Sequence, residues 1–171
     1  EIAYDICYQI GALAAFARLA KVPLVHVKPH GALYNLASQD PAAANAIAQA
    51  MFAYDPALIL VGLAGSELVR AGQAFGLQVA NEGFPDRVYL PDGQLMPRSQ
   101  PGSVIDDPKA VADNALRLVE EGVVVDGKNI QIDTLCLHGD NPKAVENAKA
   151  VRLALEDEGV EIRSLIFSEA V

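Results

Sequence analysis

A lysine and a histidine follow directly on a short apolar run near the start of this chain. Residues 24–27 predict a buried strand, and Pro29, which cannot donate to a sheet ladder, ends it. Lys28 and His30 would project from the carboxyl end of that strand, where α/β folds place their ligands. Lys28 suits a developing negative charge or a phosphate; the structural alternative is a lysine extending from the rim of the sheet.

Two further predicted strands end in polar residues in the same way. Residues 77–80 run into an acidic loop, and residues 132–137 end at a histidine, a glycine and an aspartate. If the strands are parallel, their polar residues converge on one face together with Lys28 and His30. The polar residues after these two strands are Glu82, Asp86, Arg87, His138 and Asp140.

These side chains suggest acid–base chemistry and recognition of a carboxylate. His30 and His138 are candidate acids or bases, because histidine titrates closest to neutral pH, although a hydrogen-bonded structural role is the alternative. Asp140 either orients His138, acts as a base, or caps the helix that follows.

The acidic loop carries its own pair of candidate roles. Glu82 and Asp86 form a carboxylate pair, and Arg87 offers a two-pronged donor for a substrate carboxylate. The alternative is an ion pair of Arg87 with either acid that shapes the loop. Around a predicted turn at residues 91–93, a hairpin would carry Arg98 over the site as part of a lid.

Two residues shortly after His30 could also contact a substrate. Asn35 is a candidate for binding substrate. Tyr34 is equally compatible with packing against a helix.

Helices alternate with the strands, which predicts a mostly parallel α/β arrangement. The helix starts are indicated by Asp or Asn before Pro and by Ser before Glu. The helix ends are indicated by Gly after an apolar stripe. The expected helices cover 3–20, 41–54, 66–75, 108–121 and 142–158, and the expected strands cover 24–27, 58–61, 77–80, 132–137 and 160–166.

Composition fits one α/β domain spanning residues 1–171. The apolar share of 51% contains no run of the ~20 residues that a membrane span needs, and the net charge of −9 argues against nucleic acid. Cys7 and Cys136 lack CxxC spacing, which disfavours disulfide or zinc chemistry and makes a cytoplasmic location the default. A homo-oligomer remains open.

Residues 62–66 form a glycine-containing segment before a helix. Such a segment can receive a phosphate at the helix amino terminus. It lacks the lysine and the spacing of a P-loop, which favours a tight strand-to-helix turn instead.

Several blocks of this sequence closely resemble the LamB/YcsF family, the A subunits of 5-oxoprolinase. The resemblance runs over residues 8–159, and its first block is long enough to be specific. Gly83 and Pro85 depart from the family pattern, in which valine and alanine are usual, whereas Glu82, Asp86 and Arg87 match it. The matching blocks are residues 26–35, 55–68, 84–89, 97–100 and 136–140.

The resemblance implies an irregular (β/α) barrel of the deacetylase-like type. It also implies ATP-dependent opening of 5-oxo-L-proline to L-glutamate, with hydrolysis of ATP to ADP and phosphate, together with two partner subunits that share the ATP. Three blocks expected upstream in the family do not occur here. The chain therefore resembles the carboxyl-terminal two thirds of a member and is expected to lack the first strands of the barrel.

Two other functions compete with this one. The first is a metal-dependent amidohydrolase or deacetylase in which His30, His138 and Asp140 bind a divalent ion; the missing HxxxH-type spacing weighs against it, and no metal ligand is assigned. The second is a non-catalytic assembly subunit. The resemblance favours a catalytic set of Lys28, His30, Glu82, Asp86, His138 and Asp140, with Asn35, Arg87 and Arg98 binding substrate.

Overall fold

The computed structural model describes residues 1–165, and the chain divides into two compact units, Glu1–Asn81 and Glu82–Val171. Each unit has its own apolar core. A single domain over residues 1–171 stays a prediction. In the described part of the chain, no helix is long and apolar enough to cross a membrane.

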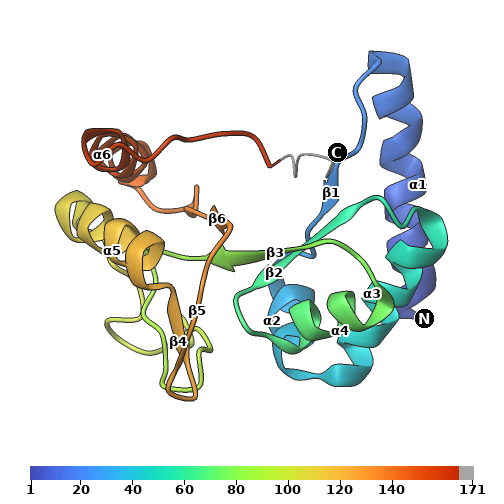
Figure 1. Cartoon of the computed structure of the whole chain (residues 1–171), viewed down its shortest axis with the longest axis horizontal. Coiled ribbons are helices and arrows are strands. Elements are labelled where there is room, and N and C mark those ends of the chain that lie inside the picture. Colours follow the sequence, from blue (N-terminus) through green and yellow to red (C-terminus); the bar gives the residue numbers. More distant parts are fainter. Residues whose placement is uncertain (166–171) are drawn as a thin grey trace. The chain divides into compact units, whose positions relative to one another are not determined.

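The first unit is built from helices and parallel strands (Figure 1). β1 pairs with β2 in parallel, with His26 opposite Ile59, and the Leu60 amide donates to the Gln78 carbonyl just before β3. β3 runs from this unit into the next, and the strand order is β1-β2-β3-β6. The elements are α1 (Ile2–Ala20), β1 (His26–Val27), α2 (Gly31–Gln39), α3 (Pro41–Tyr54), β2 (Ile59–Leu63), α4 (Glu67–Phe75) and β3 (Val79–Gly83).

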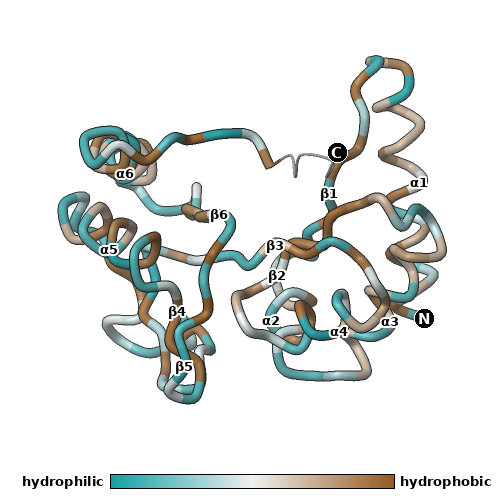
Figure 2. The backbone as a smooth tube through the Cα atoms, in the orientation of Figure 1, coloured by the Kyte–Doolittle hydropathy of each residue, from teal (hydrophilic) through white to brown (hydrophobic). Residues whose placement is uncertain are grey.

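The core of the first unit lies between its helices and β2, whose five residues are all buried. Figure 2 colours most of this strand toward the hydrophobic end of its scale. The helix starts agree with the sequence signals: the Asp40 carboxylate accepts from the Ala42 amide at 2.7 Å, and the Ser66 hydroxyl accepts from the Val69 amide.

The second unit joins the end of β3 to a hairpin and two helices. Glu82 and Gly83 pair in parallel with Thr134 and Leu135 of β6, while β4 and β5 pair antiparallel. Its core is formed where α5 and α6 pack together. The remaining elements are α5 (Pro108–Glu121), β4 (Val123–Val125), β5 (Lys128–Ile130), β6 (Thr134–Leu135) and α6 (Ala144–Asp157).

The mixed α/β class and the parallel strands are confirmed, whereas the irregular barrel and its deacetylase-like type stay predictions. One helix and one hairpin were missed. α2 begins at Gly31, whose φ of +59° turns the chain out of β1, and the β4-β5 hairpin turns at Asp126 and Gly127, both at positive φ.

Several predicted boundaries were wrong. β1 and β6 are shorter than the strands expected at residues 24–27 and 132–137. Residues 160–165 form no strand, because no neighbouring strand pairs with them in the described part of the chain, and Ile166 lies outside the described residues. α6 begins at Ala144 rather than at residue 142, after the Asn141 side chain accepts from the Lys143 amide. Glu82 belongs to β3 rather than to the loop after it, since that strand extends to Gly83 to pair with β6.

Candidate active site

Two strand ends of the second unit lie side by side and present the candidate site. β3 and β6 are parallel neighbours, and the Cys136 amide donates to the Gly83 carbonyl at 2.8 Å. The chain continues from β3 to Asp86 and from β6 to His138. The parallel pairing therefore brings these two side chains together although they are 52 positions apart.

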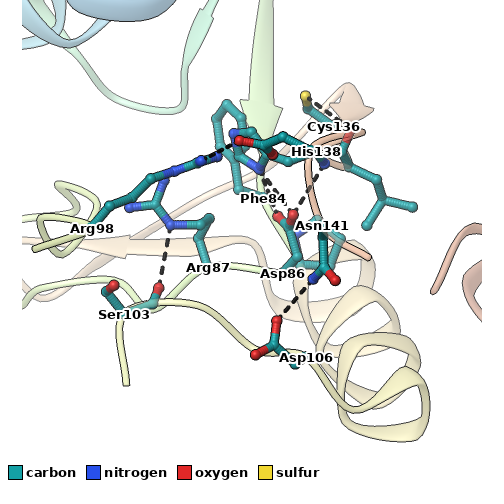
Figure 3. Close-up of polar contacts among 12 residues, drawn as sticks. Phe84, Asp86, Arg87, Arg98, Ser103, Asp106, Cys136, His138 and Asn141 are labelled. Atoms are coloured by element: carbon teal, nitrogen blue, oxygen red, sulfur yellow. Dashed lines mark hydrogen bonds and ion pairs between the residues drawn. The ribbon is translucent and has the colours of Figure 1, made fainter. Parts of the chain in front are cut away.

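Asp86 and His138 form a hydrogen-bonded pair (Figure 3). His138 Nδ1 lies 2.9 Å from Asp86 Oδ2 and 3.2 Å from Oδ1, and the His138 backbone amide donates to Oδ2 at 3.0 Å. The Asp86 side chain is 2% exposed, against 26% for His138. A carboxylate accepts hydrogen bonds, so this geometry places the ring proton on Nδ1 and leaves Nε2 available for proton transfer.

Phe84 fixes the plane of the imidazole. Its ring stacks on that of His138 with centroids 5.4 Å apart and an interplanar angle of 23°. Ring stacking and the carboxylate together restrict both the tilt and the rotation of His138. This is the arrangement that a general acid or base requires.

Arg98 reaches the same region from the loop after the predicted hairpin. That hairpin is confirmed: the Leu90 amide donates to the Gln94 carbonyl, and the Met96 amide donates to the Val88 carbonyl. Arg98 NH1 lies 2.6 Å from Asp140 Oδ2, and this hydrogen bond holds the pKa of the Asp140 carboxyl below its ordinary value.

Asp140 therefore pairs with Arg98. Asp86, and not Asp140, is the carboxylate that is hydrogen-bonded to His138 and can orient its ring. The alternative capping role of Asp140 is wrong as well, because the helix begins three residues after Asn141.

These groups surround a hollow of about 270 Å³. Asn141 spans one side of it, with its amide donating to Asp106 Oδ1 at 2.9 Å (Figure 3). Arg98 is the one lysine or arginine among the residues that line the hollow, and it forms an ion pair with Asp140. The lining residues are Asp86, Arg98, Val104, Asp106, His138, Asp140, Asn141 and Pro142.

Arg87 is buried and is not among the residues that line this hollow. Its NH2 and Nε donate to the carbonyls of Met96 and Ser103, at 2.6 and 3.2 Å, and burial lowers its pKa. These bonds tie the hairpin to the following loop, which favours a structural role for Arg87. Glu82 is also buried, 3% exposed within β3.

Lys28, His30 and Asn35 belong to the first unit. Lys28 Nζ lies 5.6 Å from the centroid of the Tyr34 ring, a cation–π contact, and Tyr34 is buried, as one of its alternatives predicted. His30 and Asn35 are exposed at and after the start of α2. The convergence of these residues with the pair in the second unit stays a prediction.

The segment at residues 62–66 is a tight strand-to-helix turn. A Cβ on Gly62 would lie 3.2 Å from Leu68 and Val69, and the Ser66 hydroxyl is used as the cap of α4. The Gly65 amide donates to the Asn81 side chain, and the Gly65 carbonyl accepts from Arg70. The Gly65, Ser66 and Val69 amides are thus hydrogen-bonded within the fold, which favours the structural alternative.

Within the part of the chain that the structure covers, no group of three His, Cys, Asp or Glu side chains is arranged to hold a metal ion. Sequence reasoning missed three members of the site, Phe84, Asp106 and Asn141. Phe84 stands within the acidic loop, Asp106 precedes the Asp107 that was expected to start a helix, and Asn141 was interpreted only as a helix start. Their contacts join segments too far apart for a local pattern to reveal.

Comparison with known proteins finds a family match and similar proteins for this chain. The model of the LamB/YcsF family matches residues 1–169. The chain is 53% identical to the 5-oxoprolinase A subunit of Syntrophobacter fumaroxidans, over 95% of this chain and 66% of the relative. It is 54% identical to the protein of the same name from Methylococcus capsulatus, over 96% of this chain and 65% of the relative.

A solved structure gives the same result. The crystal structure of "Lactam Utilization Protein" from Thermus thermophilus aligns with a TM-score of 0.86 at 50% identity, over 96% of this chain and 67% of that chain. The chain thus spans about two thirds of the length of the relatives it matches. With the whole chain matched by the family model and half of its residues identical to these relatives, this protein belongs to the LamB/YcsF family.

Proposed function

We propose that this protein acts within an ATP-dependent 5-oxoprolinase, which opens 5-oxo-L-proline to L-glutamate while ATP is hydrolysed to ADP and phosphate. The observation that carries the proposal is the Asp86–His138 pair beside a small hollow, in a chain about half identical to proteins named as A subunits of 5-oxoprolinase. The two other subunits of such an enzyme are part of the proposal.

Lactam opening needs three things from a site: a base for water, stabilisation of an oxyanion, and an acid for the departing nitrogen. His138 Nε2 takes the proton from the attacking water and later returns it to the ring nitrogen as the carbon–nitrogen bond breaks. Asp86 and Phe84 hold the imidazole during both transfers. Transfer of the terminal phosphoryl group of ATP to the lactam oxygen releases ADP and makes the ring carbon more electrophilic. Water addition and C–N cleavage then give the acyl phosphate of the side-chain carboxyl, which a second water hydrolyses to L-glutamate and phosphate.

The remaining polar residues have roles that follow from charge. Arg98 binds the carboxylate of 5-oxoproline, exchanging its contact with Asp140 for the substrate. Lys28 stabilises the developing negative charge or the transferred phosphate, provided that the two units bring it to the hollow. Five other residues stay candidates for catalysis or substrate binding: His30, Glu82 and Asp140 for catalysis, and Asn35 and Arg87 for substrate binding.

ATP is expected to bind largely through the partner subunits. In the glycine-containing turn that the sequence offered for a phosphate, the Gly65, Ser66 and Val69 amides are hydrogen-bonded within the fold. This protein would then contribute the lactam site, and its partners the nucleotide.

The test is glutamate formation from 5-oxoproline and ATP by the full-length gene product mixed with its candidate partner subunits. We expect activity only when ATP and all subunits are present. The Lys28→Ala variant should lose most of this activity, whereas Lys109→Ala, at an exposed ion pair on α5, should keep it.

Other outcomes identify the competing functions. Activity on amide substrates that a chelator abolishes, without any need for ATP, would establish the metal-dependent hydrolase. If Lys28→Ala and His138→Gln both keep full activity, the protein has a non-catalytic role in assembly.

A further inference from the structure

Three carboxylates line the hollow of the candidate active site, and two of them already face a partner that carries or can accept a positive charge. Asp86 is hydrogen-bonded to the imidazole, and Asp140 forms an ion pair with Arg98. The third carboxylate is Asp106. It accepts from the neutral side-chain amide of Asn141, and among the described residues no lysine, arginine or histidine is paired with it. Asp106 therefore places an uncompensated negative charge on the wall of the hollow.

Asn141 holds Asp106 in one orientation. The Asn141 Nδ2 group donates to Asp106 Oδ1 at 2.9 Å (Figure 3), while Asn141 Oδ1 accepts from the Lys143 amide at 2.8 Å. Because both ends of the side-chain amide are engaged, its donor end faces Asp106. Asp106 Oδ2 receives no hydrogen bond from the described part of the chain and keeps its lone pairs for a ligand. A carboxylate binds a positively charged donor more strongly than a neutral one.

The proposed reaction creates a positively charged donor only when the ring opens. The lactam nitrogen of 5-oxoproline belongs to an amide and carries no charge. Cleavage of the carbon–nitrogen bond turns it into a primary amine, which takes a proton at neutral pH and becomes an ammonium. A fixed carboxylate beside this nitrogen stabilises the opened form more than the lactam, and such a difference between two states is what assists a reaction.

The same charge would suppress a wasteful return reaction. Ring opening leaves an acyl phosphate and an amine in one molecule. The lone pair of a neutral amine can attack the acyl carbon, so that phosphate leaves and 5-oxoproline forms again. ATP is then hydrolysed to ADP and phosphate without any gain of glutamate. A protonated amine has no lone pair for this attack, so a site that keeps the nitrogen as an ammonium directs the intermediate to hydrolysis by the second water.

We propose that Asp106 binds the ammonium group of the opened intermediate and of L-glutamate, and thereby couples ATP hydrolysis to ring opening. This inference rests on the proposed function. Asp140 is the competing acceptor, because Arg98 would release it on binding the substrate carboxylate. Asp106 is favoured because Asn141 holds it in place, whereas Asp140 is 64% exposed and is positioned by the ion pair that the substrate would break.

The test measures phosphate and glutamate released by the assembled enzyme, in the parent and in Asp106→Asn. Asparagine has nearly the same shape as aspartate and can still accept from Asn141, so the contact between the two loops is kept. The parent should release one phosphate for each glutamate. Asp106→Asn should raise this ratio about twofold or more while it continues to hydrolyse ATP. Asp113→Asn, at an exposed ion pair on α5, is the matched control and should keep the parental ratio.

Water labelled with heavy oxygen gives a second readout, which a structural role for Asp106 would not change. The water oxygen that adds to the ring carbon stays on that carbon. If the ring closes again, the original lactam oxygen leaves with the phosphate. The 5-oxoproline recovered from Asp106→Asn should therefore carry the label, whereas that recovered from the parent should carry little.

The outcomes separate this inference from the proposed function. A parental ratio and unlabelled 5-oxoproline in Asp106→Asn, beside a parent that forms glutamate, would overturn the inference and leave the proposed function standing. A raised ratio in Asp140→Asn but not in Asp106→Asn would overturn it too, since Asp140 would then hold the ammonium. So would an equal loss of ATP hydrolysis and glutamate formation in folded Asp106→Asn, because Asp106 would then act before the ring opens. No glutamate from the parent assembly would overturn the proposed function, and this inference with it.

Discussion

His138 and Asp86 depend on each other for the geometry that acid–base catalysis requires. The buried carboxylate decides which ring nitrogen carries the proton, and the stacked Phe84 decides where the other nitrogen points. Replacing the carboxylate by an amide should therefore leave the fold intact and disturb the chemistry.

We expect Asp86→Asn to lower kcat of the assembled enzyme by about 10²-fold or more, because the amide no longer enforces the Nδ1–H tautomer. Steady-state glutamate formation measures this, with Asp113→Asn on the exposed surface of α5 as the control. An unchanged kcat with an unchanged circular dichroism spectrum would remove Asp86 from the catalytic machinery.

Arg98 and Asp140 make a second residue-scale prediction. Arg98 lowers the pKa of Asp140, so the ion pair is present above the ordinary carboxyl pKa of ~3.9 and is lost as the pH falls through the lowered value. In Arg98→Ala the Asp140 pKa should rise toward that ordinary value. Carboxyl NMR titration measures the change, and an Asp140 pKa that stays where it was would mean that the two side chains do not interact in solution.

At the scale of elements, Tyr89 closes the loop that carries the acidic residues. Its hydroxyl accepts from the Phe84 amide at 2.7 Å, and burial raises the Tyr89 pKa. A tyrosine whose folded pKa is raised contributes stability that is present below about pH 10, the ordinary tyrosine pKa, and is lost as the pH rises toward the folded pKa.

Tyr89→Phe should accordingly lower the free energy of unfolding by about 1–2 kcal/mol, because the Phe84 amide loses its acceptor. The difference from the parent protein should shrink in alkaline solution. Denaturant unfolding at about pH 7 and about pH 10.5, on either side of the ordinary tyrosine pKa, tests both statements. An equal or larger difference at the higher pH would contradict the assigned role of the hydroxyl.

The turn from α5 into β4 depends on a glycine. Gly122 has φ +79° and ψ −165°, and a Cβ there would lie 2.3 Å from the Ile130 carbonyl oxygen. Gly122→Ala should cost more than about 3 kcal/mol, since both strain and a backbone clash arise. Gly127→Ala, at φ +77° with open space around it, should cost only about 1 kcal/mol in the same unfolding assay. Similar losses for the two variants would contradict this account.

The sequence predicted the long helices well because their signals are local. Asp40, Ser66 and Asp107 each cap the helix that they were expected to start. Local signals did not predict the β4-β5 hairpin, and they wrongly predicted a strand at residues 160–165. A strand forms only where a neighbouring strand pairs with it, and a local sequence pattern does not show that neighbour. For the same reason the sequence identified His138 and Asp86 as candidates but offered Asp140, as one of three alternatives, for orienting His138.

At the scale of the whole molecule, the two units divide the candidate residues between them. The first unit supplies Lys28 and His30, and the second supplies the acid–base pair, its aromatic support and Arg98. Under the proposed function these units act within a larger assembly, a proposal supported by relatives that are named as A subunits. Activity is thus expected from the assembled enzyme and not from this chain alone.

The most direct test of the central claim is single-turnover glutamate formation by the assembled enzyme carrying His138→Gln, beside His26→Gln as the control. His26 is exposed in β1, outside the residues that line the hollow. His138→Gln should slow ring opening about 10²- to 10⁴-fold while His26→Gln leaves it unchanged. Ring opening at the parental rate in His138→Gln would contradict the assignment of proton transfer to this histidine.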